Sequence, residues 1–224
     1  MFENFYHSKY FEEYAVFFVP HQRYYMRAVE AVETMHILRS GLMDSHADFL
    51  ADHAVGDFMK IRFETKVKDL ENADLSRVKK VVMVGSGPLP ETILFLNENF
   101  SIPEIIGIDN NEEAVLFGSE LLSYLGVGNA SIDYADGVVY DYTDVDFVYI
   151  ASFVPPKNKV LDQIARTAPD HVQIVVETPL LMNKMLFEEV TSQKLHPRLK
   201  IIKRGLNETD YFRHEILTIE KYST

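Results

Sequence analysis

The sequence predicts an α/β fold in which a mainly parallel, seven-stranded sheet is preceded by a helical region. From residue 79 onward, short apolar runs alternate with helix-length segments, a pattern typical of a doubly wound sheet. Within residues 1–78, apolar side chains recur at helical spacing and no β-branched run interrupts them. The chain is therefore expected to consist of an N-terminal helical cap or lid, 1–78, and a sheet domain, 79–224.

The order of the expected elements supports this fold. The first five strands are expected at residues 81–84, 105–109, 130–134, 147–151 and 172–176, with helices at 91–97, 112–125 and 157–168 between them. Two further strand candidates, 199–203 and 214–220, follow the last helix. Two closing strands in this place predict an antiparallel hairpin at one edge of the sheet.

Composition limits the classes of partner. The 224 residues include 34 acidic and 22 basic side chains, for a net charge of −12 and no basic cluster. Such a chain is a poor candidate for binding the phosphate backbone of nucleic acids. It tolerates a cationic small molecule better than a polyanion, so we expect a small-molecule partner.

Residue types that are missing from the sequence exclude other classes. There are no cysteines, which rules out disulfides, thiolate zinc sites and a cysteine nucleophile. The eight histidines form no His-x-x-x-His pair, so no metal is expected. There is no signal peptide pattern and no 18-residue apolar run, which predicts a cytoplasmic protein without a membrane span. The aromatic N-terminus can form a lid, pack within the cap or make a homodimer interface; we favour the lid or cap.

A glycine turn at residues 84–90, Val-Gly-Ser-Gly-Pro-Leu-Pro, joins the first strand to the first helix of the sheet domain. Such a turn brings backbone N–H groups and a helix N-terminus toward a ligand. A dinucleotide-binding loop would have glycine at position 90, where Pro90 stands, so a nucleoside without phosphate is favoured over a pyrophosphate. The residues of this turn expected to contact the nucleoside are Gly85, Ser86, Gly87, Pro88 and Leu89.

Two acidic residues follow neighbouring strands. Asp109 ends the second strand and is expected to accept the ribose hydroxyls; its alternative role is a helix N-cap. Asp136 follows the third strand and is expected to contact the adenine amino group. Its alternative role is a plain Asp-Gly turn. The adjacent Asn110 and Gly137 are assigned to the same nucleoside site, as is Ala151 after the fourth strand.

The glycine turn resembles the loop of nicotianamine synthases and of the related bacterial opine-metallophore synthases. The segment 30–36, Glu-Ala-Val-Glu-Thr-Met-His, is similar to a helical motif of that family. Residues 151–157, Ala-Ser-Phe-Val-Pro-Pro-Lys, resemble its segment after strand four, and 182–187 its stretch after strand five. The similarity extends over about residues 24–190, and the glycine turn is its most specific part.

The resemblance implies a Rossmann-like, class I fold that binds S-adenosylmethionine (SAM) as a substrate. Members of this family use SAM as an aminocarboxypropyl donor: an amine attacks the carbon γ to the carboxylate, and methylthioadenosine leaves. Glu33 matches a family glutamate on the helical cap, where a carboxylate can hold the reacting amine or accept its proton. Its alternative is a solvated helix face. Ser152 and Asn158 are further candidates for holding the amine.

Three positions depart from the family pattern. Phe63 stands where the family has a tyrosine, and Glu177 and Asn183 stand where it has two arginines. Arginine is the usual bidentate partner of a carboxylate, and Glu177 would repel one, so a second amino-acid substrate is disfavoured. The sequence is similar in size and in its reduced cap to the azetidine-2-carboxylate synthases, whose reaction is the attack of SAM's own amine on its γ-carbon.

Aromatic side chains can hold the sulfonium by cation–π attraction, worth about 2 kcal/mol in a dry site. The candidates are Phe153, Phe63, Tyr25 and Tyr134, and the alternative for each is ordinary core packing. Cyclisation is placed slightly ahead of transfer to an outside amine. A conventional small-molecule methyltransferase and a SAM-binding regulator without catalysis are the other two interpretations.

Overall fold

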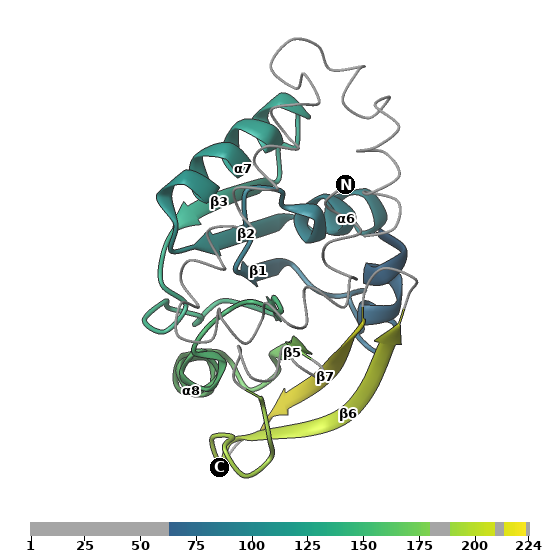
Figure 1. Ribbon diagram of the computed structural model, residues 1–224, viewed down its shortest axis with the longest axis vertical. Helices are drawn as coiled ribbons and strands as arrows, with labels where there is room; N and C mark the ends of the chain where they lie inside the picture. Colours follow the sequence, from purple (N-terminus) through teal and green to yellow (C-terminus); the bar gives the residue numbers. More distant parts are fainter. Residues whose placement is uncertain (1–62, 180–188, 209–212, 223–224) are drawn as a thin grey trace, which may run out of the picture.

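The computed structural model describes residues 63–179, 189–208 and 213–222 of the chain. Within these residues, seven strands form one sheet in the order β3-β2-β1-β4-β5-β7-β6 (Figure 1). The strands are β1 (Lys80–Val84), β2 (Glu104–Asp109), β3 (Ala130–Tyr134), β4 (Phe147–Ile150), β5 (Gln173–Pro179), β6 (Leu199–Glu208) and β7 (Arg213–Lys221). The predicted α/β fold with a seven-stranded sheet is confirmed.

The pairing of the strands matches the predicted topology. Strands β1 to β5 pair in parallel, whereas β7 is antiparallel to both β5 and β6. Strand β6 continues to Glu208, well past the predicted end at 203. Its second half lies at the sheet edge and is mostly exposed. A strand of this kind carries polar residues, so the apolar run marks only its beginning.

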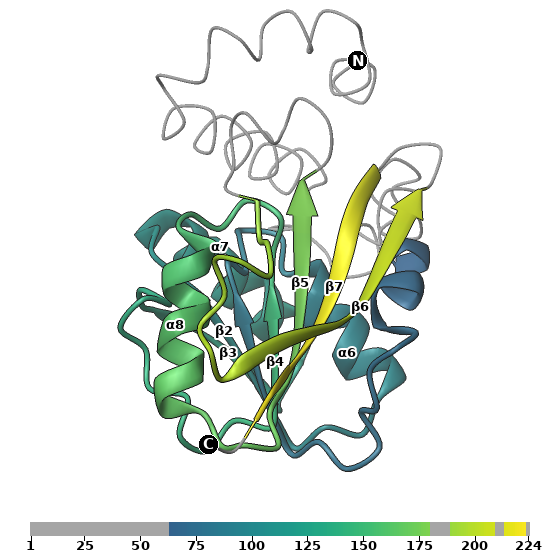
Figure 2. The ribbon, with the colours of Figure 1, turned by 90° about the horizontal axis from the view of Figure 1, so that it is seen from below.

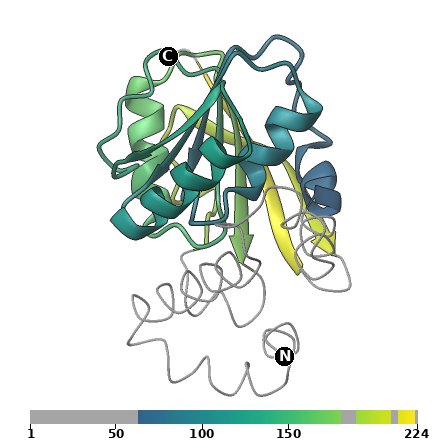
Figure 3. The same ribbon diagram turned by 90° about the horizontal axis from the view of Figure 1, so that it is seen from above.

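Helices cover both faces of the sheet. The described helices between the strands are α6 (Glu91–Asn99), α7 (Glu112–Tyr124) and α8 (Lys157–Thr167). Figures 2 and 3 show α6 and α8 on opposite faces. Alternate residues of β1 belong to the two resulting hydrophobic clusters, with Val81 packing with residues of α6 and Val82 with residues of α8. The strand is therefore buried on both sides, which explains its continuous apolar sequence.

Residues 63–70 are helical and pack on the sheet domain. Leu70, Leu75 and Val78 belong to the same hydrophobic cluster as Ile93 of α6. The end of the predicted cap is thus part of the core of the sheet domain. The boundary at residue 78 and the rest of the cap stay predictions, because residues 1–62 lie outside the described part of the chain. In the described part, no helix has the length and apolar character needed to cross a bilayer.

Candidate nucleoside site at the carboxyl ends of the strands

The glycine turn is tied to strand β2 through its own amide groups. Gly85 and Gly87 both have positive φ, +77° and +67°, a conformation that glycine adopts without strain. The N–H groups of Gly85 and Ser86 donate to the Ile108 carbonyl (2.8 and 3.2 Å), and that of Gly87 donates to Asp109 Oδ2 (2.9 Å). The structure differs here from the expectation that these N–H groups face a ligand. A turn whose amides are bonded within the protein suits a nucleoside better than a phosphate.

Two other segments lie directly against this turn. A Cβ at residue 85 would collide with Val154 Cγ2 in the segment 151–156, which we call the post-β4 loop. A Cβ on Gly118 of α7 would stand 3.1 Å from the carbonyl oxygen of Gly87. Ala151 begins the post-β4 loop and its N–H donates to the Val84 carbonyl (3.1 Å). Glycines therefore let the turn, α7 and the post-β4 loop approach one another closely.

Asp109 holds the glycine turn and the start of α7 together. Its side chain is buried, and Oδ1 accepts the N–H of Asn111 (3.0 Å) while Oδ2 accepts that of Gly87. Burial raises the pKa of Asp109 above its ordinary value, although hydrogen bonds from Gly87, Asn111 and Asn110 oppose the shift. The N-cap of α7 is Asn111, whose side chain accepts the N–H of Glu113 (3.1 Å). The N-cap role weighed for Asp109 thus belongs to Asn111.

Asp136 and Gly137 lie beside the same end of the sheet. The Asp136 side chain is exposed, and its Oδ1 accepts the N–H of Val138 (2.9 Å), which is the turn geometry expected of Asp-Gly. A Cβ on Gly137 would stand 2.8 Å from Val84 Cγ1, so this glycine brings its segment against the end of β1. The exposed carboxylate of Asp136 lies in that segment.

The post-β4 loop is held by two buried charged side chains. The N–H of Ser152 donates to Glu177 Oε2 (3.1 Å), and the carbonyl oxygen of Ser152 accepts a hydrogen bond from Lys157 Nζ. Lys157 is fully buried at the start of α8 and also donates to the Val154 carbonyl (3.2 Å). Both backbone polar groups of Ser152 are therefore bonded to charged groups, an arrangement that favours one fixed position of the loop.

The structure brings some of the predicted site residues together and separates others. The glycine turn, Asp109, Asp136 and Ala151 to Phe153 meet at the carboxyl ends of β1 to β4, with Asn158 in the first turn of α8. Phe63 is partly buried and packs against the hydrophobic core, edge-to-face with Phe95 at 5.4 Å between ring centroids, which favours the packing role. Tyr134 is 61% exposed at the end of β3. The predictions for Glu33, Tyr25 and Asn183 concern positions outside the described residues.

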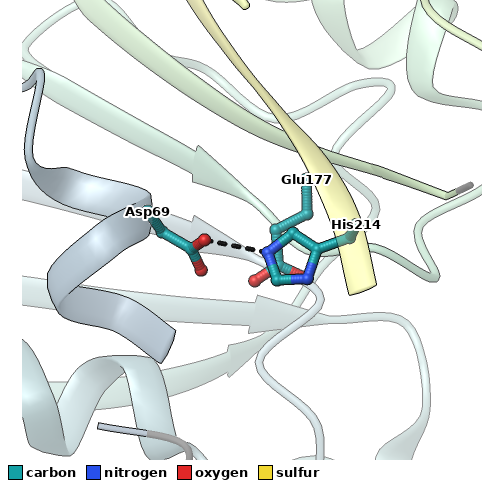
Figure 4. A group of neighbouring side chains, drawn as sticks. All are labelled: Asp69, Glu177 and His214. Atoms are coloured by element: carbon teal, nitrogen blue, oxygen red, sulfur yellow. Dashed lines mark hydrogen bonds and ion pairs between the residues drawn. The ribbon is translucent and has the colours of Figure 1, made fainter. Parts of the chain in front are cut away.

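A buried charge cluster lies beside the post-β4 loop and was not predicted. It consists of Lys66, Asp69, Tyr149, Glu177, Asn207 and His214. Asp69 Oδ1 accepts hydrogen bonds from Asn207 Nδ2 (2.6 Å) and the His214 imidazole (2.8 Å), and Oδ2 lies 2.8 Å from the Tyr149 hydroxyl. Figure 4 shows Asp69, Glu177 and His214 pointing toward one another from the 63–70 helix, β5 and β7.

Lys66 supplies the positive charge of the cluster. Its Nζ donates to Glu177 Oε1 and to the Tyr149 hydroxyl (2.9 Å), and lies 3.5 Å from Asp69 Oδ2. Burial, followed by the nearby Asp69 and Glu177 carboxylates, raises the pKa of Tyr149 well above its ordinary value, so the hydroxyl stays neutral. The groups that face one another are thus two carboxylates, one ammonium and the His214 imidazole.

The environment of Glu177 changes its sequence-based interpretation. Glu177 was expected to repel the carboxylate of an acceptor, but it is 4% exposed and ion-paired with Lys66. Its charge is therefore compensated inside the protein. The sequence indicates Glu177 as a candidate, because an acidic residue stands directly after the apolar run of β5. Its pairing with Lys66, 111 residues away, follows only from the fold.

Three members of the cluster have the ligand types of a metal site. Asp69, Glu177 and His214 each offer a ligand atom, and these atoms lie within 4.8 Å of one another. Lys66 Nζ, however, already contacts both carboxylates, and a divalent cation would have to displace this ammonium. The donor set therefore fits a compensated buried ion cluster better than a metal centre.

Comparison with known proteins supports the fold assignment. No protein-family model and no curated protein sequence matches the chain. The nicotianamine synthase MtNAS, solved in complex with MTA and tNA, is similar with a TM-score of 0.75 at 17% identity over 90% of this chain and 74% of that chain. A point mutant of MtNAS in complex with S-adenosylmethionine gives 0.74 at 16% identity over 89% and 76%. The cyclase SpnF gives 0.58 at 13% identity over 72% and 82%.

Proposed function

We propose that this chain binds SAM at the carboxyl ends of β1 to β4 and consumes it as a substrate by cleaving the bond between sulfur and the γ-carbon, with release of methylthioadenosine. The observation that carries the proposal is the meeting of the glycine turn, Asp109 and the post-β4 loop at one end of a sheet that has the fold of MtNAS. In this proposal the turn contacts the nucleoside. Asp109 accepts hydrogen bonds from the ribose hydroxyls, and the exposed Asp136 carboxylate accepts one from the adenine amino group.

The proposed reaction is intramolecular. The SAM amine loses its proton and its nitrogen forms a bond with the γ-carbon, while the electron pair of the breaking carbon–sulfur bond goes to sulfur. The products are azetidine-2-carboxylate, neutral methylthioadenosine and one proton, so atoms and charge balance. Ser152, Asn158 and Glu33 are the candidates for holding the amine, and Phe153 for packing on the sulfonium. Orientation of the arm decides which carbon is attacked, because the sulfonium activates all three.

The absence of an arginine at position 177 supports cyclisation over transfer. Where the nicotianamine synthase pattern has an arginine suited to a carboxylate, this chain has a buried glutamate whose charge is already matched. Transfer of the aminocarboxypropyl group to an external amine remains the second candidate. A methyltransferase and a SAM-binding regulator are the two interpretations outside this chemistry.

Analysis of the reaction products separates these candidates. Purified protein is mixed with SAM alone, then with SAM and a set of amino acids, and the products are identified by mass spectrometry. We expect methylthioadenosine and azetidine-2-carboxylate from SAM alone. Methylthioadenosine formed only when an amino acid is present would replace cyclisation by transfer. S-adenosylhomocysteine would contradict both, and SAM binding without turnover would favour the regulator.

The raised pKa of Asp109 predicts a pH dependence of nucleoside binding. Ribose hydroxyls donate to the ionised carboxylate, so protonation on lowering the pH removes an acceptor and weakens binding. Because burial raises the pKa of Asp109, affinity should begin to fall at a higher pH than for an ordinary aspartate, whose pKa is about 3.9. The test is the affinity for methylthioadenosine between about pH 4 and 7. An Asp109→Asn variant with the same pH slope as wild type would refute the assignment.

A further inference from the structure

The peptide groups of Ser152 are fixed by buried charges on two different elements. Glu177, on β5, accepts the Ser152 N–H, while Lys157, at the start of α8, donates to the Ser152 carbonyl. Both charged side chains are buried, Lys157 completely and Glu177 to all but 4%. Hydrogen bonds to charged groups are about twice as strong as neutral ones, so the position of this peptide depends on where the two charges are held.

The orientation of the Glu177 carboxylate is in turn set by the buried charge cluster. Oε1 accepts from Lys66 Nζ and from the Tyr149 hydroxyl, which leaves Oε2 directed at the Ser152 N–H. Lys66 is held near Asp69, whose other oxygen is bonded to His214. The 63–70 helix, β4, β5 and β7 thus all contribute to the direction of one carboxylate.

The post-β4 loop is anchored on both sides of Ser152 and Phe153. Val154 packs so closely on Gly85 that no side chain fits between them, and Ala151 is hydrogen-bonded to the end of β1. Between these two contacts lie Ser152 and Phe153, two of the residues assigned to the reacting arm of SAM in the proposed function. A shift of the Ser152 peptide would therefore move the groups that orient the arm without moving those that bind the nucleoside.

We propose that Glu177 is a positioning residue that fixes the Ser152–Phe153 segment and thereby decides whether the arm of bound SAM folds onto its own γ-carbon. This inference rests on the proposed function. Glu177 stands at the position where the nicotianamine synthase pattern has an arginine, so in this chain that position acts on the loop through a hydrogen bond to the Ser152 amide. Lys66 acts with it by directing the carboxylate.

A Glu177→Gln variant isolates this role. The amide has one acceptor oxygen in place of two, and the buried Lys66 ammonium is the stronger donor, so the oxygen turns to Lys66 and the NH₂ group faces the Ser152 N–H. Two donors then oppose each other and the loop shifts. Asp69, 3.5 Å from the ammonium, remains as a counter-charge, so the variant keeps a compensated cation and is expected to fold.

The experiment compares wild type, Glu177→Gln and Asp170→Asn. Asp170 is a control for the loss of a paired carboxylate: it is paired with Arg198 at 2.6 Å, but it is exposed and precedes β5 at the opposite end of the strand. Each protein is assayed for methylthioadenosine affinity, for KM and kcat with SAM, and for the ratio of azetidine-2-carboxylate to methylthioadenosine. For Glu177→Gln we expect unchanged methylthioadenosine affinity, a kcat about 10²-fold lower and a lower ring yield. Asp170→Asn should match wild type.

Three results would overturn the inference. A purely structural role predicts that folded Glu177→Gln keeps the wild-type kcat and product ratio. A loss of methylthioadenosine affinity equal to the loss of kcat would mean that the whole site is disturbed. A drop of the same size in Asp170→Asn would show that the effect is not specific to the loop. Should Glu177→Gln not fold, Glu177→Asp, which keeps the negative charge but shortens the side chain so that one carboxylate no longer reaches both Lys66 and the Ser152 N–H, gives the same comparison.

The outcome is separable from failure of the proposed function. If wild type binds SAM without turnover, the proposed cyclisation fails, and the inference is then tested by affinity alone. Glu177→Gln must then weaken SAM binding while leaving methylthioadenosine binding unchanged, since only SAM has the arm. Equal affinities of wild type and variant for both ligands would overturn it. If wild type binds neither ligand, both the proposed function and the inference are contradicted.

Discussion

Replacing Lys66 by Met is expected to lower the free energy of unfolding by about 3–5 kcal/mol. Lys66 is 1% exposed and is the ammonium that contacts both Asp69 and Glu177. Removing it leaves the buried Asp69 and Glu177 carboxylates without the ammonium that contacts both. Met fills a similar volume, so the loss reports on charge and hydrogen bonding more than on packing.

Thermal and urea denaturation measure this loss. For a chain of this size, the expected change corresponds to a fall in Tm of about 6–20 °C. Lys159→Met is the matched control, because Lys159 is an exposed lysine on α8, and its variant should unfold within about 0.5 kcal/mol of wild type. Equal stability of the two variants would contradict the assignment of Lys66 as the cation of the buried charge cluster.

Asp109→Ala is expected to weaken binding of both SAM and methylthioadenosine by about 1.5–3 kcal/mol, which is roughly a 10- to 150-fold rise in Kd. The charged acceptor for the ribose hydroxyls is lost. The Gly87 N–H also loses its partner, so the glycine turn is less firmly held. Both losses weaken contacts with the nucleoside, which SAM and methylthioadenosine share. The ratio of the affinities for these two ligands should therefore stay constant.

Titration calorimetry with the two ligands tests this expectation. Asp133→Ala is the matched control: Asp133 is an exposed acid on β3, and its removal changes the net charge by the same amount. Attraction of the SAM cation to a generally acidic protein would make the two variants lose SAM affinity equally. Wild-type affinity for methylthioadenosine in Asp109→Ala would remove Asp109 from the ribose site.

Most of the fold follows from local sequence patterns. Strands such as β1 and β4 are buried on both faces and read as continuous apolar runs, so their positions and parallel order could be predicted. The exposed second half of β6 could not, because an edge strand needs no such pattern. The glycine turn and Asp109 could be found as site candidates, since each lies directly after a strand and the carboxyl ends of parallel strands share one edge.

The rest of the site depends on contacts between distant residues. Lys66, Tyr149 and His214 lie far apart in the sequence and on three different elements, and no spacing links them. The direction of the N–H groups of the glycine turn, toward Ile108 and Asp109, likewise depends on how β1 and β2 pair. For Phe63, the sequence suggested a site residue, because an aromatic side chain stands at a position of the family pattern. Its contact with Phe95 shows that it packs against the core.

The most direct test of the central claim is to follow which bond of SAM is broken. SAM isotopically labelled in its methyl carbon is incubated with the purified protein and the label is followed by NMR. We expect the labelled methyl group to stay on sulfur and to appear in methylthioadenosine. Transfer of the label to another molecule, together with formation of S-adenosylhomocysteine, would contradict it.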